Sequence, residues 1–366
     1  MMKNRIKKLV FLTESMVSAG GVVRVISLWA NYFSQMGFNC KILSVIPGKA
    51  YFGLEKNINF KIKKYIFKNK ILALPINLLL ILPILKEAKS SYLIVNKSAY
   101  IEPIYFWRKL GFFKNIKLVY FSHGGNNEFE TFYMSRRTTK HRVRMIFDVF
   151  DDVVCLFKNT DTTPDVVKDD KIKFIFNPCP IPTYIRGANE YDKVVIFVGR
   201  VTKKKGVDDL IKAWKIIEPK HKNWKLQIVG DGSDKEECIS LAQNLELKNI
   251  SFYESTNDIV KYLRRSTISI LPSLFEGMGL SILEAKSQGC AVISTKTSGG
   301  KKLINDMING ILVDISNVQE LANKIDLLIN DENLRNRIIR QAYSEMNVFD
   351  ISSIAKSWSQ VFKDDI

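Results

Sequence analysis

The sequence has little cysteine and histidine. There are three histidines, and the five cysteines are odd in number, scattered and never in a Cys-x-x-Cys pair. This argues against a disulfide framework or a zinc ribbon and fits a reducing compartment. Glycine is also sparse, at 19 of 366 residues, which excludes a collagen-like chain, and the 46% hydrophobic content excludes a disordered one. The length predicts a globular protein of two domains.

The chain also lacks a long uninterrupted apolar run. The basic start is followed by an apolar run that ends at Leu12, too short for a secretory signal, so we interpret it as a buried strand. Ile71–Leu85 would span roughly 22 Å as a helix, less than the ~30 Å hydrocarbon core of a bilayer. Pro75 and Pro83 also interrupt it. It is not expected to cross a membrane. Two interpretations stay open: a core helix, or a helix in the membrane interface between basic flanks.

Acidic residues are scarce in the first 150 positions. That part holds 25 Lys and Arg against 7 Asp and Glu, whereas residues 151–366 hold 30 of each kind. The formal net charge of +18 therefore arises entirely in the first part. Such a field attracts an anionic membrane, a phosphorylated substrate or nucleic acid. The alternative is a solvated basic face with no dedicated partner.

Short β-rich apolar runs alternate with helix-like segments along most of the chain. This alternation predicts βαβ units and parallel sheets. Residues 177–192 contain three prolines and no periodicity, which favours a linker. The fold class is therefore α/β, with two doubly wound domains and ligands at the carboxyl ends of strands, in the cleft between them. The predicted strands of the first domain are 8–13, 39–46, 58–65, 92–96, 117–122, 152–156 and 171–176. Those of the second are 193–198, 224–229, 249–253, 267–271, 291–294 and 310–313.

Two loops carry groups suited to phosphate. Gly20-Gly21 follows the first strand and opens a helix, where backbone N–H groups can meet an anion. The segment is neither a P-loop nor a Gly-x-Gly-x-x-Gly turn, and a simple tight turn remains an alternative. Arg200 and Lys205 follow the first strand of the second domain. Their two cations could neutralise a diphosphate without a metal ion.

The strongest pattern runs from Leu271 to Ala285. A strand ends, a glycine-rich turn carries Glu276, and a helix begins near Gly279 and carries Glu284. The N–H groups of the turn are available as donors to a sugar or a phosphate. The four turn residues are Gly277, Met278, Gly279 and Leu280.

These motifs, together with Val229-Gly230-Asp231-Gly232 and Ser298-Gly299-Gly300, resemble glycosyltransferase family 4. The order and spacing match over about residues 193–315, and Ser122-His123-Gly124 matches more loosely. The resemblance implies the GT-B fold, with a C-terminal helix that crosses back to the N-terminal domain. It places the acceptor-binding domain at residues 1–178 plus 349–366, and the nucleotide-sugar domain at 190–348.

The resemblance also assigns roles. Arg200 and Lys205 match the pair that binds the donor diphosphate, and Gly20 and Gly21 match the loop that closes over the phosphates. Glu276 matches the glutamate beside the transferred sugar, with the N–H groups of 277–280 around it. Glu284 matches the glutamate that binds the ribose hydroxyls, and His123 matches the histidine near the sugar. The implied enzyme is retaining, needs no cofactor and no metal, and binds no nucleic acid.

The acceptor is predicted from the charge distribution. The basic N-terminal domain suits the cytoplasmic face of an anionic inner membrane, to which the protein would bind peripherally. This favours a UDP-sugar donor and a polyprenyl-diphosphate-linked saccharide acceptor, as in O-antigen, lipopolysaccharide or capsule synthesis. Alternatives are a GDP-mannose-dependent mannosyltransferase, a non-catalytic partner protein and a non-hydrolysing epimerase. The membrane-docking residues predicted are Lys61, Lys63, Lys64, Lys68, Lys70, Arg136 and Arg137.

Overall fold

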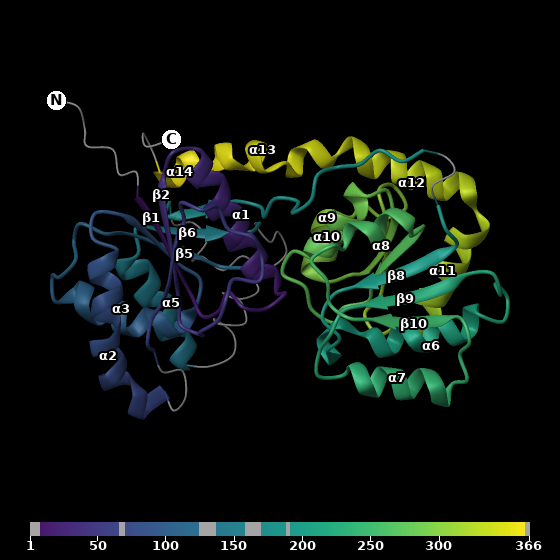
Figure 1. Cartoon of the computed structure of the whole chain (residues 1–366), viewed down its shortest axis with the longest axis horizontal. Helices are drawn as coiled ribbons and strands as arrows, with labels where there is room; N and C mark the ends of the chain where they lie inside the picture. Colours follow the sequence, from purple (N-terminus) through teal and green to yellow (C-terminus); the bar gives the residue numbers. More distant parts are fainter. Residues whose placement is uncertain (1–7, 66–69, 124–136, 158–169, 188–190, 363–366) are drawn as a thin grey trace. The chain divides into compact units, whose positions relative to one another are not determined.

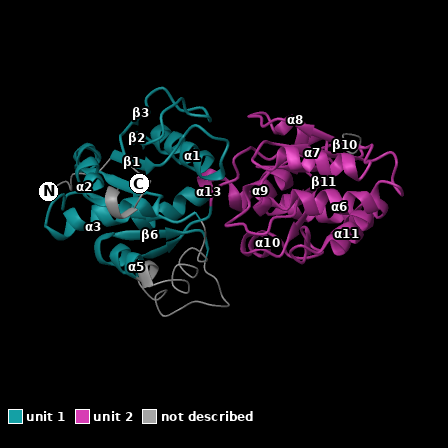
Figure 2. Ribbon diagram, turned by 90° about the horizontal axis from the view of Figure 1, so that it is seen from below, with its two compact units in different colours: residues 1–176, 354–366 teal, residues 177–353 magenta. Residues whose placement is uncertain are grey.

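The computed structural model describes residues 8–65, 70–123, 137–157, 170–187 and 191–362. The chain divides into two compact units, coloured separately in Figure 2. Unit 1 comprises residues 1–176 and 354–366, and unit 2 comprises residues 177–353. Each unit contains one parallel sheet with helices on its faces (Figure 1), so the predicted α/β fold of two domains is confirmed.

The described part of unit 1 holds a seven-stranded parallel sheet in the order β3-β2-β1-β4-β5-β6-β7. Each strand lies within, or coincides with, a run predicted from the sequence. The strands are β1 (Lys8–Thr13), β2 (Asn39–Ser44), β3 (Asn59–Ile62), β4 (Tyr92–Val95), β5 (Lys117–Phe121), β6 (Asp152–Cys155) and β7 (Ile172–Phe174). The helices are α1 (Gly21–Gln35), α2 (Lys70–Glu87), α3 (Ile101–Lys109) and α5 (Arg137–Val149), with a 3₁₀ turn at Ser98–Tyr100.

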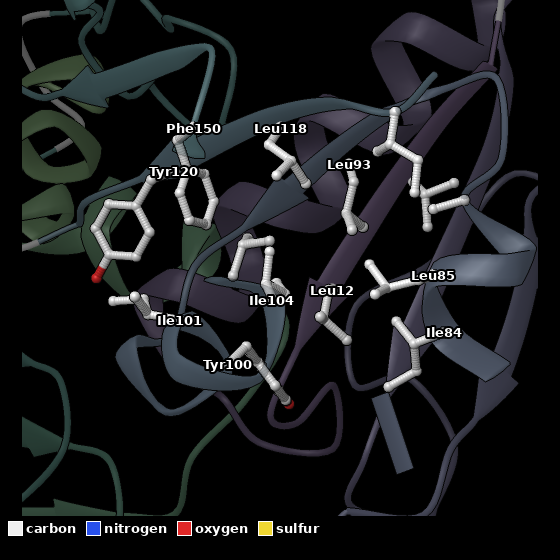
Figure 3. Packing of buried hydrophobic residues seen from close by; sticks show 14 of the residues in the cluster. Leu12, Ile84, Leu85, Leu93, Tyr100, Ile101, Ile104, Leu118, Tyr120 and Phe150 are labelled. Carbon is white, nitrogen blue, oxygen red and sulfur yellow. The ribbon is translucent and has the colours of Figure 1, made fainter. Parts of the chain in front are cut away.

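Side chains alternate across this sheet because successive residues of a strand point to opposite faces. Val10 and Leu12 of β1 join the core beneath α2, α3 and α5. Figure 3 shows Leu12 and Leu93 of the sheet beside Ile84 and Leu85 of α2. One face of the carboxyl-terminal half of α2 thus packs in the core.

The other face of the sheet is covered by α1 and by the end of the chain. In unit 1 that end, from residue 354, contains the last two residues of α13 (Ile351–Ala355), a 3₁₀ turn at Lys356–Trp358 and α14 (Ser359–Phe362). The Trp358 ring lies 5.5 Å from that of Trp29, and the Phe362 ring lies 5.2 Å from that of Phe33. Tyr92 Oη donates to the Phe362 carbonyl at 3.1 Å. The chain end therefore packs in unit 1, as the GT-B fold requires.

The described part of unit 2 holds a six-stranded parallel sheet in the order β10-β9-β8-β11-β12-β13. The strands are β8 (Val194–Val198), β9 (Lys225–Val229), β10 (Ile250–Tyr253), β11 (Ile268–Leu271), β12 (Ala291–Thr295) and β13 (Ile311–Val313). The helices are α6 (Val207–Ile217), α7 (Lys235–Asn244), α8 (Val260–Arg265), α9 (Leu280–Ser287), α10 (Ser298–Leu303), α11 (Val318–Asn330) and α12 (Glu332–Ser344), with 3₁₀ turns at Lys203–Lys205 and Met346–Phe349. Strand order reverses between β8 and β11, and ligands bind open α/β sheets at such a switch point.

Candidate active site

Two loops meet at the switch point of unit 2. Residues 199–206 follow β8, residues 272–279 follow β11, and the Leu274 N–H donates to the Lys204 carbonyl at 2.9 Å. Gly206 adopts φ +62°, and a Cβ there would collide with the Pro272 carbonyl oxygen. Glycine at 206 is therefore what allows the two backbones to approach.

The approach of the loops brings Lys205 to Glu276. The ammonium is ion-paired with Glu276 Oε1, and Ser273 Oγ donates to the same oxygen at 2.8 Å. Glu276 is only 8% exposed. Thr295 Oγ1 donates to the Ser273 carbonyl at 2.5 Å and so holds this loop from β12. A half-buried cation paired with one carboxylate can share its remaining N–H donors with a phosphate oxygen.

Ser273 was not predicted from the sequence, although a short hydroxyl residue three positions before Glu276 is a recognisable signal. Arg200 behaves differently from Lys205. Its side chain is exposed beside the carboxyl end of β8. The two cations thus share one loop, and the described contacts join Lys205, rather than Arg200, to the carboxylate.

The turn after Glu276 is held from α10. The Gly299 N–H donates to the Glu276 carbonyl at 3.1 Å, and a Cβ at Gly299 would crowd the Met278 backbone. Met278 is buried, and its sulfur accepts the Asn177 N–H at 3.3 Å. The Met278 side chain is therefore structural, so only backbone groups of 277–280 suit the predicted donor role.

Gly279 precedes α9 in a left-handed conformation, with φ +78°. That conformation is strained for other residues, and it starts α9 directly after the turn. Leu280 is the first residue of α9, and Glu284 lies one turn further along, buried at 5% exposure. Glu276 and Glu284 are thus both buried carboxylates on one loop–helix segment.

His123 follows β5 in unit 1. Its ring lies 4.2 Å from that of Phe121, and both ring nitrogens are buried with no partner among the described residues. Burial lowers the pKa of His123 to about 3. The imidazole is therefore neutral at physiological pH, which suits a hydrogen bond to a bound hydroxyl better than a charge on a phosphate. Gly124 of the same motif lies outside the described residues.

Gly20 and Gly21 lie at the start of α1 in unit 1. Gly20 has an ordinary φ of −84°, and a Cβ there would make only an ordinary 3.6 Å contact with Ser18 Oγ. The described fold does not itself require glycine at this position. Close approach of a ligand to the backbone is an alternative reason for glycine there.

Of the basic residues predicted to dock on a membrane, Lys61 and Lys64 are exposed and Lys63 is half-buried. Lys61 and Lys63 pair with Glu87, as does Lys41. Burial raises the pKa of Glu87, but hydrogen bonds from Lys41 and Lys63 outweigh this and lower it to about 2. Lys63 is held in this ion pair, and its predicted role in membrane docking stays a prediction. Lys68 and Arg136 lie outside the described residues. Lys70 and Arg137 begin α2 and α5, and their side chains are not described.

One cavity, of about 580 Å³, lies elsewhere in unit 2. It is lined by residues around β8, β9, β10 and α8, including Lys225, Tyr253 and Arg265. None of the predicted donor-binding residues lines it. We place the candidate site at the loops of Lys205 and Glu276 instead, because buried charged groups and the switch point coincide there.

Comparison with known proteins gives the class of the chain. Residues 183–345 match the family model of glycosyl transferases group 1. An uncharacterized glycosyltransferase of Haemophilus influenzae is 28% identical over 362 residues, covering 97% of this chain and 99% of that protein. A Campylobacter jejuni enzyme is 28% identical over 192 residues, covering 51% of this chain and 53% of its own length. It is named as an α-1,4-N-acetyl-D-galactosaminyltransferase acting on a diphospho-undecaprenol-linked saccharide.

Solved structures agree on the fold. HepE from Anabaena, crystallised with UDP and glucose, has a TM-score of 0.79 at 19% identity, covering 97% of this chain and 99% of that one. At this identity the likeness carries the fold alone. The chain is therefore a glycosyltransferase of GT-B fold, with residues 183–345 matching the group 1 glycosyl transferases.

Proposed function

We propose that this protein transfers a sugar, with retention, from a UDP-sugar to a polyprenyl-diphosphate-linked saccharide in surface polysaccharide synthesis. It would act peripherally at the inner face of the plasma membrane. The observation that carries the proposal is the buried Glu276 carboxylate held by Lys205 and Ser273 at the switch point of unit 2. The named activity of the Campylobacter relative and the UDP in the HepE crystal support the acceptor and donor classes.

Lys205 and Arg200 would bind the donor diphosphate. Lys205 is held in place by Glu276 before the ligand arrives, so little side-chain entropy is lost on binding. Arg200 is exposed and would close on the phosphates from solvent. Backbone N–H groups at 277–280 would add donors at the start of α9.

The reaction separates charge, and the site has groups suited to the growing negative charge and to the growing positive charge. The acceptor hydroxyl oxygen bonds to the anomeric carbon as the bond from that carbon to the diphosphate oxygen breaks. The bonding electron pair leaves with the diphosphate, which takes the hydroxyl proton. Negative charge grows on the diphosphate, where preorganised Lys205 and Arg200 would stabilise it. Positive charge grows on the sugar, near which we place the Glu276 carboxylate. Neutral His123 would orient the sugar or the acceptor by a hydrogen bond.

The acceptor assignment depends on charge. A diphosphate-linked acceptor is anionic, and the first 150 residues carry the whole +18 of the chain. Opposite charge concentrates such a substrate and speeds its encounter with the protein. A GDP-mannose-dependent mannosyltransferase remains the alternative, because neither the donor base nor the sugar is determined by the residues above.

A donor screen tests the proposal. Thermal unfolding is followed with UDP, GDP, ADP and their sugars, and stabilisation by uridine compounds is expected. Transfer is then assayed with the stabilising donor and a polyprenyl-diphosphate saccharide, and nuclear magnetic resonance gives the anomeric configuration of the product. Stabilisation by guanosine compounds would favour the mannosyltransferase. Binding of no nucleotide at all would refute the donor site.

A further inference from the structure

Unit 1 exposes a group of large apolar side chains on α2, on α3 and on the turn after α3. Leu79 is 65% exposed, Leu110 56%, Phe112 52%, Ile76 48% and Phe106 42%. Soluble monomers rarely leave so many large apolar side chains together in water without a function. We call these five residues the α2–α3 patch.

Trp107 makes the patch continuous. Its indole N–H donates to the Leu78 carbonyl at 2.7 Å, which joins the end of α3 to the middle of α2. The Trp107 ring lies 5.3 Å from that of Phe106 and 5.4 Å from that of Phe112. Pro83 has no N–H to donate to the Leu79 carbonyl four residues earlier, so the indole bond to Leu78 does not replace the bond that the proline removes.

The two faces of α2 explain why the patch is not core. Asn77, Ile81, Ile84 and Leu85 are buried on one face. Ile76, Leu79, Pro83 and Lys86 recur at helical spacing on the opposite, solvent-facing side. The core interpretation of Ile71–Leu85 therefore holds for one face of α2, whereas the other face is exposed and its place in a membrane interface stays a prediction. Among the described residues, no helix is both long and apolar enough to cross a membrane.

The rim of the patch is basic. Lys86, Lys89, Lys109 and Lys114 are exposed at the ends of α2 and α3. Asn115 Nδ2 donates to Ser90 Oγ at 3.3 Å, which brings the turn carrying Lys114 beside the end of α2. Glu87 pairs with Lys41 and Lys63, and Asp148 pairs with Lys109, so the net positive charge of the rim comes from Lys86, Lys89 and Lys114. The patch thus combines apolar side chains with a surrounding positive charge.

We propose that the α2–α3 patch inserts into the interfacial region of an anionic lipid bilayer and docks unit 1 on the membrane that carries the acceptor. This inference rests on the proposed function, because a membrane-bound acceptor is the reason that docking is needed. The patch gives the location of the docking surface. Apolar side chains enter the headgroup boundary while the lysine rim meets anionic headgroups. A second copy of the chain fits less well, because it would bring two basic rims together. These docking residues differ from Lys61 and Lys63, which share the single carboxylate of Glu87 with Lys41.

Sedimentation with vesicles tests this inference. The full chain is mixed with vesicles of equal parts phosphatidylglycerol and phosphatidylcholine, and with phosphatidylcholine alone. The test variant combines Leu79→Ser, Leu110→Ser and Phe112→Ser. The control variant combines Ile185→Ser, Ile308→Ser and Val348→Ser, which are 80%, 54% and 59% exposed in unit 2. Thermal stabilisation by UDP is recorded on the same samples, and sedimentation velocity gives their oligomeric state.

We expect the wild type and the control variant to bind the anionic vesicles. The test variant should bind about a hundredfold more weakly, since each half-exposed apolar side chain contributes about a factor of five. Its stabilisation by UDP should be unchanged. Equal binding of test and control variants would refute the inference, as would a wild type that leaves all vesicles in the supernatant while still binding UDP. A wild-type dimer that the test variant dissociates would assign the patch to self-association instead. Vesicle binding without any nucleotide binding would refute the proposed function and leave the docking surface standing.

Discussion

Replacement of Lys205 by methionine tests the candidate site most directly. Methionine keeps much of the apolar length of the side chain and removes the ammonium. The change leaves the Glu276 carboxylate, 8% exposed, with Ser273 as its described donor. Losing a preorganised charge donor to the leaving group should lower kcat by a few hundredfold.

The same change should also destabilise unit 2. Removing one partner of a fully buried ion pair costs about 3–5 kcal/mol. The Lys205 side chain is 21% exposed and Ser273 remains, so we expect about 2 kcal/mol. In a unit of this size that corresponds to a fall of about 4–8 °C in the unfolding midpoint. Scanning calorimetry with and without UDP, together with a transfer assay, measures both effects.

Matched variants separate the two effects. Lys204→Met removes a neighbouring, exposed lysine and should change neither stability nor turnover. The double variant Lys205→Met with Glu276→Gln should recover much of the stability, because no buried charge is left unpaired, but not the activity. Wild-type turnover and stability in Lys205→Met would show that the ion pair has no part in the reaction.

Four further predictions concern other residues of the candidate site and the need for metal. Arg200→Ala should lower kcat by a similar few hundredfold without changing the unfolding midpoint, because its side chain is exposed; a stability loss would contradict this. Turnover should survive EDTA, and its abolition with rescue by Mn²⁺ would contradict neutralisation by cations alone. Gly206→Ala should lower the free energy of unfolding by about 1–3 kcal/mol, because residue 206 has a left-handed φ. Gly20→Ala should leave the free energy of unfolding unchanged and weaken UDP binding. Because folding lowers the pKa of His123 from 6.5 to about 3, stability should fall by up to about 1.4 kcal/mol per unit as pH drops from 6.5 towards 3. Over pH 6.5 to about 5.5, above the range in which Glu87 titrates in either the folded or the unfolded state, His123→Phe should flatten that slope.

Local pattern alone predicted the parallel strands and the positions of the loops to which we assign phosphate binding. A buried strand needs only a short apolar run, and a left-handed turn such as that at Gly279 favours glycine whatever surrounds it. The sequence therefore located Lys205, Glu276 and Glu284 on the correct elements. It also showed that the charge excess lies in the first 150 residues.

Only the tertiary structure decided which side chains meet. Lys205 and Glu276 are 71 positions apart, and their pairing depends on the order of β8 and β11 in the sheet. Likewise the ion pair between Lys63 and Glu87 joins residues from two segments that lie apart in the sequence. The apolar segment of α2 is buried on one face and exposed on the other, because only one of its faces packs against the sheet. Composition and spacing report local preference, whereas burial and charge pairing arise from contacts between segments distant in sequence, so these features required the folded chain.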